Sequence, residues 1–227
     1  MSNPATMHHH AHGPANRRRR VLRTAAPLFV RHPRWRPRAA VVVLHDVHGL
    51  TAMTEDRCRQ LAQCGYLAIA PYLYYQTGGR EFPPEHEETA RVAAALLDAD
   101  DVVAGVAGAL DHLHRRLNIP ASSTAVLGSG TGGYLASWAA ANYALGAAVA
   151  LHPDGDDLAP WPSMPDLAQV LRRLRTPWLA VAGPDIPRAA SEAASSCENA
   201  KVLATSTERT GADRWGEAVD FLRSHTS

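Results

Sequence analysis

The stretch TAVLGSGTGGY, residues 124–134, passes from a short apolar run into a glycine-rich turn. An alanine-rich segment with helical spacing follows, so the stretch predicts a strand, a tight turn and a helix. Such a turn can present a catalytic nucleophile in the pattern Gly-x-nucleophile-x-Gly. With Gly128 and Gly132 as the outer glycines, the nucleophile position is Gly130. The turn therefore has the outline of a catalytic site without the side chain that would act in it.

The same letters also fit a second pattern. Gly128, Gly130 and Gly133 satisfy G-x-G-x-x-G, the fingerprint of dinucleotide-binding turns. A predicted strand at 145–151 would complete a βαβ unit, and Asp154 lies about 20 residues beyond the fingerprint, where a ribose-binding acid is expected. This pattern predicts an NAD(P)-binding oxidoreductase. However, dinucleotide units usually open their domain, whereas several predicted elements precede this turn.

Apolar segments of strand length alternate with helical patterns on both sides of the turn. In the first predicted helix, Thr54 is the expected N-cap and Gly65 the expected stop after the last turn. The predicted strands are 28–32, 39–46, 66–71, 124–128, 146–153, 178–183 and 201–205. The other predicted helices are 85–97, 101–117, 132–143, 165–174, 189–197 and 213–224.

This alternation predicts the fold class. The predicted strands are apolar throughout, as expected for strands buried on both faces of a parallel sheet. We therefore expect a doubly wound α/β fold, with a mostly parallel sheet and helices on both faces. One domain over residues 21–227 and a disordered tail over residues 1–20 follow from the pattern and the chain length.

Composition limits the classes of partner and cofactor. The net charge of +1 gives no reason to expect nucleic acid, and no apolar run is long enough to span a membrane. Arg23, Pro27 and Arg31 interrupt any signal-peptide core, so we expect a cytoplasmic protein. Three cysteines, without metal or redox spacing, predict neither a metal nor another cofactor.

The order of the elements and their loops resembles the dienelactone hydrolase family of the α/β-hydrolase fold. The resemblance covers roughly residues 39–223 in the right order and implies an α/β-hydrolase-like fold. It rests on VVVLHDVHGL (41–50), RCRQLAQCGYLAIAPYLYY (57–75), AVLGSGTGGYLA (125–136) and PWLAVAGPD (177–185).

The resemblance implies roles for individual residues. The backbone N–H groups of Val47 and Thr131 would form the oxyanion hole, which stabilises negative charge on a reacting carbonyl oxygen. Asp46 stands where the family has a glutamate, and Asp185 stands at the position of the triad acid. Gln76 replaces an arginine that often holds a substrate carboxylate in the family.

At two positions that carry catalytic side chains in the family, this sequence has other residues. Residue 130 is neither cysteine nor serine, and Ala212 in ERTGADRW occupies the position of the family's histidine. Covalent acyl transfer needs a nucleophile and a base that takes its proton. The sequence therefore predicts a hydrolase relative that has lost triad hydrolysis.

The retained pocket suits small-molecule binding or non-hydrolytic acid/base chemistry of the isomerase, cyclase or lyase type. Asp46 and His48 are the candidate acid/base residues, and the ligand is expected to be small, mostly apolar and oxygenated. The alternative is that these two side chains only hydrogen-bond their own turn, and that the tyrosines pack with their hydroxyls in water. The other residues expected at the pocket mouth are Tyr72, Tyr74, Tyr75, Gln76 and His152.

A third hypothesis is an active ester or lactone hydrolase with displaced catalytic residues. It requires Ser129 to act with His152, or a base from the end of the chain such as His225. Ser129 would leave the strand on the face opposite to residue 130, because adjacent side chains of a strand alternate.

Overall fold

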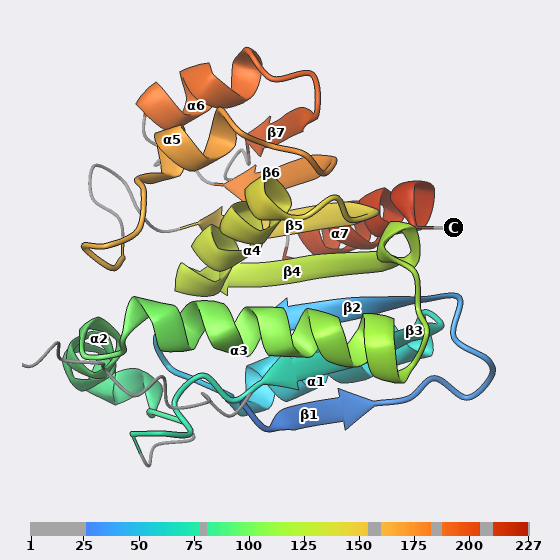
Figure 1. Cartoon of the computed structure of the whole chain (residues 1–227), viewed down its shortest axis with the longest axis horizontal. Coiled ribbons are helices and arrows are strands. Elements are labelled where there is room, and N and C mark those ends of the chain that lie inside the picture. Colours follow the sequence, from blue (N-terminus) through green and yellow to red (C-terminus); the bar gives the residue numbers. More distant parts are fainter. Residues whose placement is uncertain (1–25, 78–80, 154–159, 183–187, 205–210, 227) are drawn as a thin grey trace, which may run out of the picture.

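The computed structural model describes residues 26–77, 81–153, 160–182, 188–204 and 211–226. Its centre is a seven-stranded sheet with the order β1-β3-β2-β4-β5-β6-β7 (Figure 1). Strand β1 runs antiparallel to β3, and every other neighbouring pair is parallel. The predicted doubly wound, mostly parallel α/β-hydrolase-like sheet is confirmed.

The strands are β1 (Leu28–Arg31), β2 (Ala39–Leu44), β3 (Tyr66–Pro71), β4 (Thr124–Gly130), β5 (Ala147–Pro153), β6 (Trp178–Ala182) and β7 (Ala200–Ala204). The α-helices are α1 (Ala52–Gln63), α2 (Glu87–Ala95), α3 (Ala99–Asp111), α4 (Thr131–Asn142), α5 (Leu167–Leu171), α6 (Arg188–Ser195) and α7 (Gly211–His225). A π-helix over His112–Arg116 continues α3. None of the described helices is long and apolar enough to cross a membrane.

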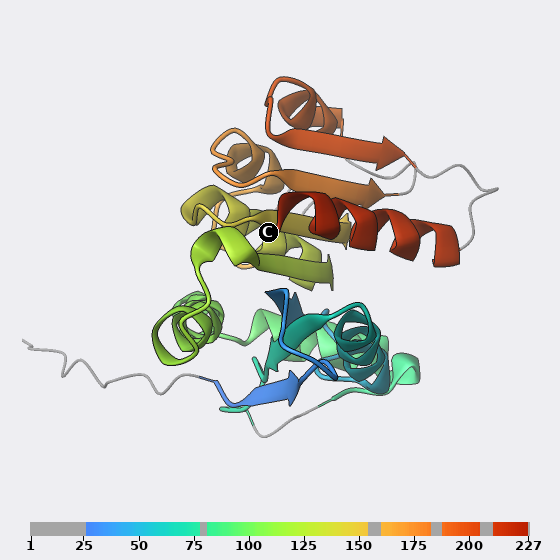
Figure 2. The same ribbon diagram turned by 90° about the vertical axis from the view of Figure 1, so that its right-hand side faces the viewer.

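Each face of the sheet carries its own core. Helices α2 to α6 cover one face, while α1 and α7 cover the other (Figures 1 and 2). Strand β2 shows how one segment serves both cores: Ala40, Val42 and Leu44 pack under the first group of helices. The residues between them pack under the second group, because successive side chains of a strand point to opposite faces. This explains why the predicted strands are apolar throughout.

The first helix begins earlier than the sequence predicted. Its N-cap is Thr51, and the predicted N-cap Thr54 is wrong, since that residue is buried in the first turn. Exposed Ala52 and Met53 join the helix although neither belongs to its apolar stripe, because both residue types favour helix. The predicted stop is confirmed: Gly65 follows the C-cap with φ +91°, a conformation that glycine adopts without strain.

Close backbone packing explains the glycines around the turn between β4 and α4. A Cβ atom on Gly128 would lie 2.0 Å from the carbonyl oxygen of Gly132. A Cβ atom on Gly132 would lie 2.2 Å from the carbonyl oxygen of Leu44, and one on Gly133 would lie 3.0 Å from the Cα atom of Pro153. Packing inside the protein therefore accounts for two glycines of the G-x-G-x-x-G pattern, Gly128 and Gly133. The same contacts bring the start of α4 against the end of β2.

Candidate functional site

Gly130 lies where β4 ends and α4 begins, at the carboxyl edge of the sheet. Its backbone has φ 56° and ψ −125°, in a region that side-chain-bearing residues adopt only under strain. The pairing of β4 with β5 shifts register at this point, because Ser129 pairs with Leu151 and Gly130 pairs with Pro153. A sharp strand-to-helix turn of this kind is where α/β-hydrolases carry the nucleophile.

The segment that follows β2 forms a second turn beside this one. The Oδ1 atom of Asp46 accepts a hydrogen bond from the backbone N–H of His48 at 2.9 Å. The carbonyl oxygen of Asp46 accepts one from the N–H of Gly49 at 3.1 Å. Asp46 therefore hydrogen-bonds its own turn through both its side chain and its carbonyl oxygen, as the alternative for this residue predicted.

His45 holds the second turn to the segment that follows β3. The backbone N–H of Leu73 donates to its Nε2 atom at 3.2 Å, which makes Nε2 the unprotonated nitrogen. Its Nδ1 atom accordingly donates to the carbonyl oxygen of Asp46 at 2.8 Å. Burial lowers the pKa of His45, because the imidazolium form would lose its hydration. Sequence reasoning missed this residue, whose only signal was a histidine directly after a buried strand.

Tyr74 adds a second link between the two segments. Its hydroxyl donates to the carbonyl oxygen of Val47 at 2.7 Å, and its ring stacks on the His45 ring with centroids 5.5 Å apart. Burial raises the pKa of Tyr74. The alternative that placed the tyrosine hydroxyls in water is wrong for Tyr74, which is buried inside the wall of the turn.

Acidification is expected to destabilise the protein through His45. Since its pKa is lower in the folded state, the unfolded chain binds more protons as the pH falls below about 6.5. This contribution to stability is complete above that pH and decreases by up to about 1.4 kcal/mol per pH unit below it. Urea unfolding at pH 7.5 and at more acidic pH would measure the slope, and His45→Gln should reduce it. Replacing the exposed His225 by Gln is the control for a histidine-to-glutamine change outside the core.

A cavity of about 380 Å³ opens beside the second turn. Asp46, His48, Thr51 and Glu81 supply its polar wall, and residues such as Met53 and Pro83 supply its apolar wall. The Nδ1 atom of His48 is buried and has no hydrogen-bond partner among the residues described here. The His48 side chain thus forms part of the polar wall while one of its ring nitrogens stays unpaired among these residues.

His152 lies at a different cavity, so the predicted pocket mouth is divided. This second cavity, of about 740 Å³, lies between α1 and α7 and is also lined by Arg57 and Arg214. Burial lowers the pKa of Arg57, and the nearby negative charge of Asp46 opposes that shift. His152 is exposed and has φ 45°, which is unusual for a residue with a side chain.

The remaining residues predicted at the pocket mouth lie outside the cavity at Asp46. Tyr72 packs against the core under α1 and α7. The Nε2 atom of the exposed Gln76 donates to the hydroxyl of Tyr75 at 2.9 Å. None of these three is among the described residues that line that cavity.

The structure describes only some of the other predicted site residues. Val47 is buried, Thr131 is the first residue of α4, and Ala212 is the second residue of α7. Asp185, the predicted triad acid, and Asp154 of the dinucleotide pattern lie outside the described residues. Among the residues that are described, no three His, Cys, Asp or Glu side chains gather in a way that could hold a metal ion.

Three solved structures that share this architecture are hydrolases or esterases by name, and their low identity to this chain shows the fold alone. A Klebsiella pneumoniae protein described as a dienelactone hydrolase superposes with a TM-score of 0.72, at 21% identity, over 87% of this chain and 92% of its own. A dienelactone hydrolase-like promiscuous phosphotriesterase from metagenomic libraries has a TM-score of 0.66, at 18% identity, over 89% of this chain and 100% of its own. For the acetyl xylan esterase from Paenibacillus sp. R4 the TM-score is 0.63, at 18% identity, with coverage of 88% and 80%.

Sequence comparison leads to the family directly. A Yersinia pestis protein described as a carboxymethylenebutenolidase is 45% identical over 42 residues, a match that spans 18% of this chain and 16% of that protein. The model of the dienelactone hydrolase family matches residues 27–196, which is most of the chain and includes both turns of the candidate site. The chain therefore belongs to the dienelactone hydrolase family.

Proposed function

We propose that this protein has lost triad hydrolysis and uses its pocket to bind a small molecule or to move protons on one. The observation that carries the proposal is Gly130: the turn between β4 and α4 has φ 56° and ψ −125° at a residue without a side chain. In the family this position would carry a cysteine or a serine. With glycine there, the nucleophile position itself has no side-chain atom that could form an acyl-enzyme.

The nearest nucleophilic side chains do not replace the missing one. By strand alternation Ser129 shares a face with Leu127 and so points toward α1 and α7. Thr131 is the half-buried first residue of α4, where packing or support of the helix start accounts for its side chain. Burial raises the pKa of Cys58 to about 12, so its reactive thiolate form is scarce at neutral pH.

The cavity at Asp46 suits a small ligand with an oxygen function. Its volume of about 380 Å³ falls within the range of small-molecule sites, and its wall combines apolar side chains with a few polar ones. His48 is the proton-transfer group that we assign to this cavity, because its side chain lines the cavity wall and imidazole is the commonest general acid or base. Asp46 sits beside it with a carboxylate that also fixes the turn.

The backbone N–H groups of Val47 and Thr131 are proposed to polarise a ligand carbonyl. Support comes from the packing of Gly132, whose Cα hydrogen faces the carbonyl oxygens of Leu44 and His45 so closely that no Cβ atom would fit. This contact keeps the start of α4 beside the turn that contains Val47. Amides fixed in this way stabilise negative charge on a carbonyl oxygen whether or not a nucleophile attacks it.

The purified protein is expected to hydrolyse aryl esters and lactones no faster than buffer. A serine- or cysteine-directed acylating probe should likewise fail to label residues 129–131, as intact-mass measurement and peptide mapping would show. Gly130→Cys is the matched positive control, since it places a thiol at the apex of the turn, at a strain cost of about 1–3 kcal/mol. That variant should react with a thiol-directed probe far faster than Cys58 does.

Stoichiometric labelling of Ser129 or Thr131 in the unmodified protein would contradict the proposal and favour the displaced-nucleophile hypothesis. Labelling confined to Cys58 or Cys64 would not contradict it, because both cysteines belong to the region of α1.

A further inference from the structure

The charge of the chain is distributed unevenly. No aspartate or glutamate occurs before Asp46, whereas nine of the 23 basic residues do. The remaining 14 basic residues face 22 acidic ones, so residues 46–227 carry a net charge of −8. The net charge of +1, from which we expected no nucleic-acid partner, conceals this asymmetry. Such a division within one chain is typical of proteins that meet an anionic surface at one end.

Within the described residues, this basic charge gathers at the connection between β1 and β2. The connection and the strand end before it read RHPRWRPR over residues 31–38, and the ribbon protrudes at the lower right of Figure 1. Arg31, Arg34 and Arg36 are exposed and have no carboxylate partner among the residues described. Pro33 and Pro37 restrict the backbone on either side of the tip.

Trp35 makes this tip amphipathic. Its side chain is 77% exposed, and the guanidinium of Arg34 lies over its ring, 5.3 Å from the centroid. A cavity of about 610 Å³ separates the tip from the end of α1, and Arg31, Arg34, Arg36 and Trp35 are among the residues that line it. The tip thus combines guanidinium donors for phosphate oxygens with an indole, the side chain that membrane proteins place at the lipid–water interface.

We propose that the segment 31–38, which we call the arginine loop, docks this protein onto an anionic phospholipid surface. The arginines would bind lipid phosphates while Trp35 enters the headgroup region. Docking of this kind needs no membrane-spanning helix.

The shape and extent of the basic surface favour a bilayer over a nucleic acid. A protein that binds a nucleic-acid strand presents a basic track along the phosphates, but the chain beyond the arginine loop is acidic on balance. A bilayer requires only that a protruding tip reach it, and each basic residue near an anionic leaflet strengthens binding independently.

Docking through the arginine loop would leave the candidate site open. The loop precedes β2, whereas the turn containing Asp46 follows the same strand. Six strand residues, or about 20 Å, therefore separate the two ends. The surface contact and the small-molecule cavity therefore lie at opposite ends of β2. The docking proposal does not depend on whether the cavity is catalytic.

Vesicle sedimentation with the full chain tests the proposal. We expect binding to vesicles of equal parts phosphatidylglycerol and phosphatidylcholine, weakening with added salt, and no binding to phosphatidylcholine alone. Arg34→Gln/Arg36→Gln should reduce the partition coefficient about thirtyfold, since each basic residue contributes about fivefold. Trp35→Ala should reduce it by at least about fivefold through loss of the interfacial indole.

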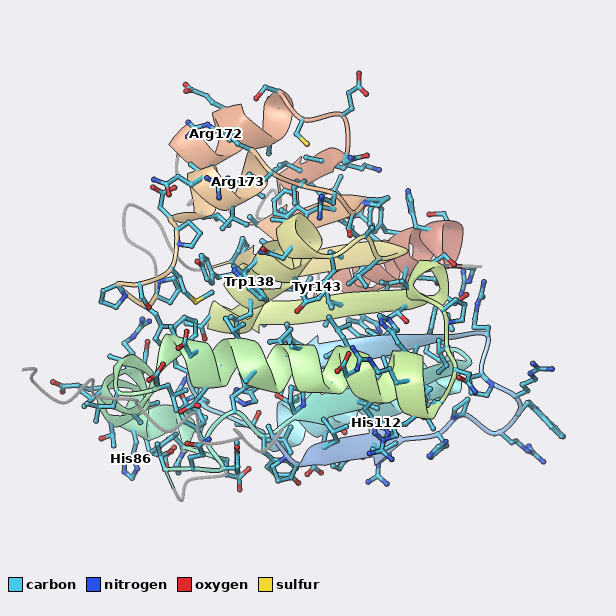
Figure 3. All side chains as sticks on the ribbon, in the orientation of Figure 1. His86, His112, Trp138, Tyr143, Arg172 and Arg173 are labelled. Atoms are coloured by element: carbon cyan, nitrogen blue, oxygen red, sulfur yellow. The ribbon has the colours of Figure 1, made fainter. Side chains whose placement is uncertain are left out.

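The matched control is Arg172→Gln/Arg173→Gln, which removes the same charge from exposed residues just beyond α5. Figure 3 shows these two arginines near the top of the molecule, toward the edge of the sheet opposite to β1. The control variant should bind vesicles like the unmodified protein. Equal losses in the two double variants, or no loss in the loop variants, would overturn the proposal. Binding to a single-stranded oligonucleotide in place of vesicles would overturn it as well.

Discussion

Gly132→Ala is expected to lower the free energy of unfolding by about 3 kcal/mol or to prevent folding altogether. The added Cβ atom would lie 2.2 Å from the carbonyl oxygen of Leu44 and 2.6 Å from that of His45. Both obstacles are backbone atoms of a central strand and its turn, so neither can rotate away. Urea unfolding followed by circular dichroism would measure the change.

Gly216→Ala is the matched control for this substitution. Gly216 lies within α7, and a Cβ atom there would meet nothing within 4 Å. Alanine favours helix over glycine, so the control should raise the free energy of unfolding by about 0.5–1 kcal/mol. Similar effects at the two positions would show that close packing between α4 and β2 does not hold the candidate site together.

Asp46→Asn and His48→Ala are each expected to cut turnover about a hundredfold, the scale for losing a positioned acid or base. Asn retains an oxygen that can accept the backbone N–H of His48, so Asp46→Asn separates proton transfer from support of the turn. A panel of small ketones, enol lactones and cyclic esters, screened for isomerisation or elimination, supplies the substrate. If the protein only binds its ligand, His48→Ala should weaken that binding, and calorimetry would measure the loss.

Asp185→Asn is the comparison that separates this proposal from ordinary family chemistry. In the family the corresponding acid orients a histidine, and we propose that Ala212 stands at the histidine position here. The variant should therefore change turnover only a few-fold while the protein remains folded. A dead Asp185→Asn variant beside nearly normal Asp46→Asn and His48→Ala variants would reverse the assignment.

Most of the fold could be predicted from the sequence because its strands are buried on both faces. Continuous apolar runs such as 39–44 and 66–71 mark such strands clearly, and the glycine at the end of α1 marks a helix stop. The antiparallel direction of β1 was not predicted, since a four-residue segment carries no signal of its neighbour's direction. The start of α1 was missed because Ala52 and Met53 are exposed and fall outside the apolar pattern.

The candidate site was less predictable, because it depends on contacts between distant segments. The turn that contains Gly130 could be identified from its glycine spacing alone. The division of Asp46 and His152 between two cavities depends on how α1 and α7 pack, which periodicity does not specify. The role of His45 depends on the backbone N–H of Leu73, 28 residues further along the chain.

The glycine at position 130 also bears on how the chain could have diverged from an active ancestor. A catalytic residue held at φ near +60° stores about 1–3 kcal/mol of backbone strain, which the rest of an active enzyme must offset. Glycine adopts the observed φ of 56° without that strain. Glycine in place of a nucleophile would thus release conformational energy at a position where activity and stability compete. Under the proposed loss of hydrolysis, a glycine at this position would increase the chain's tolerance of further destabilising mutations.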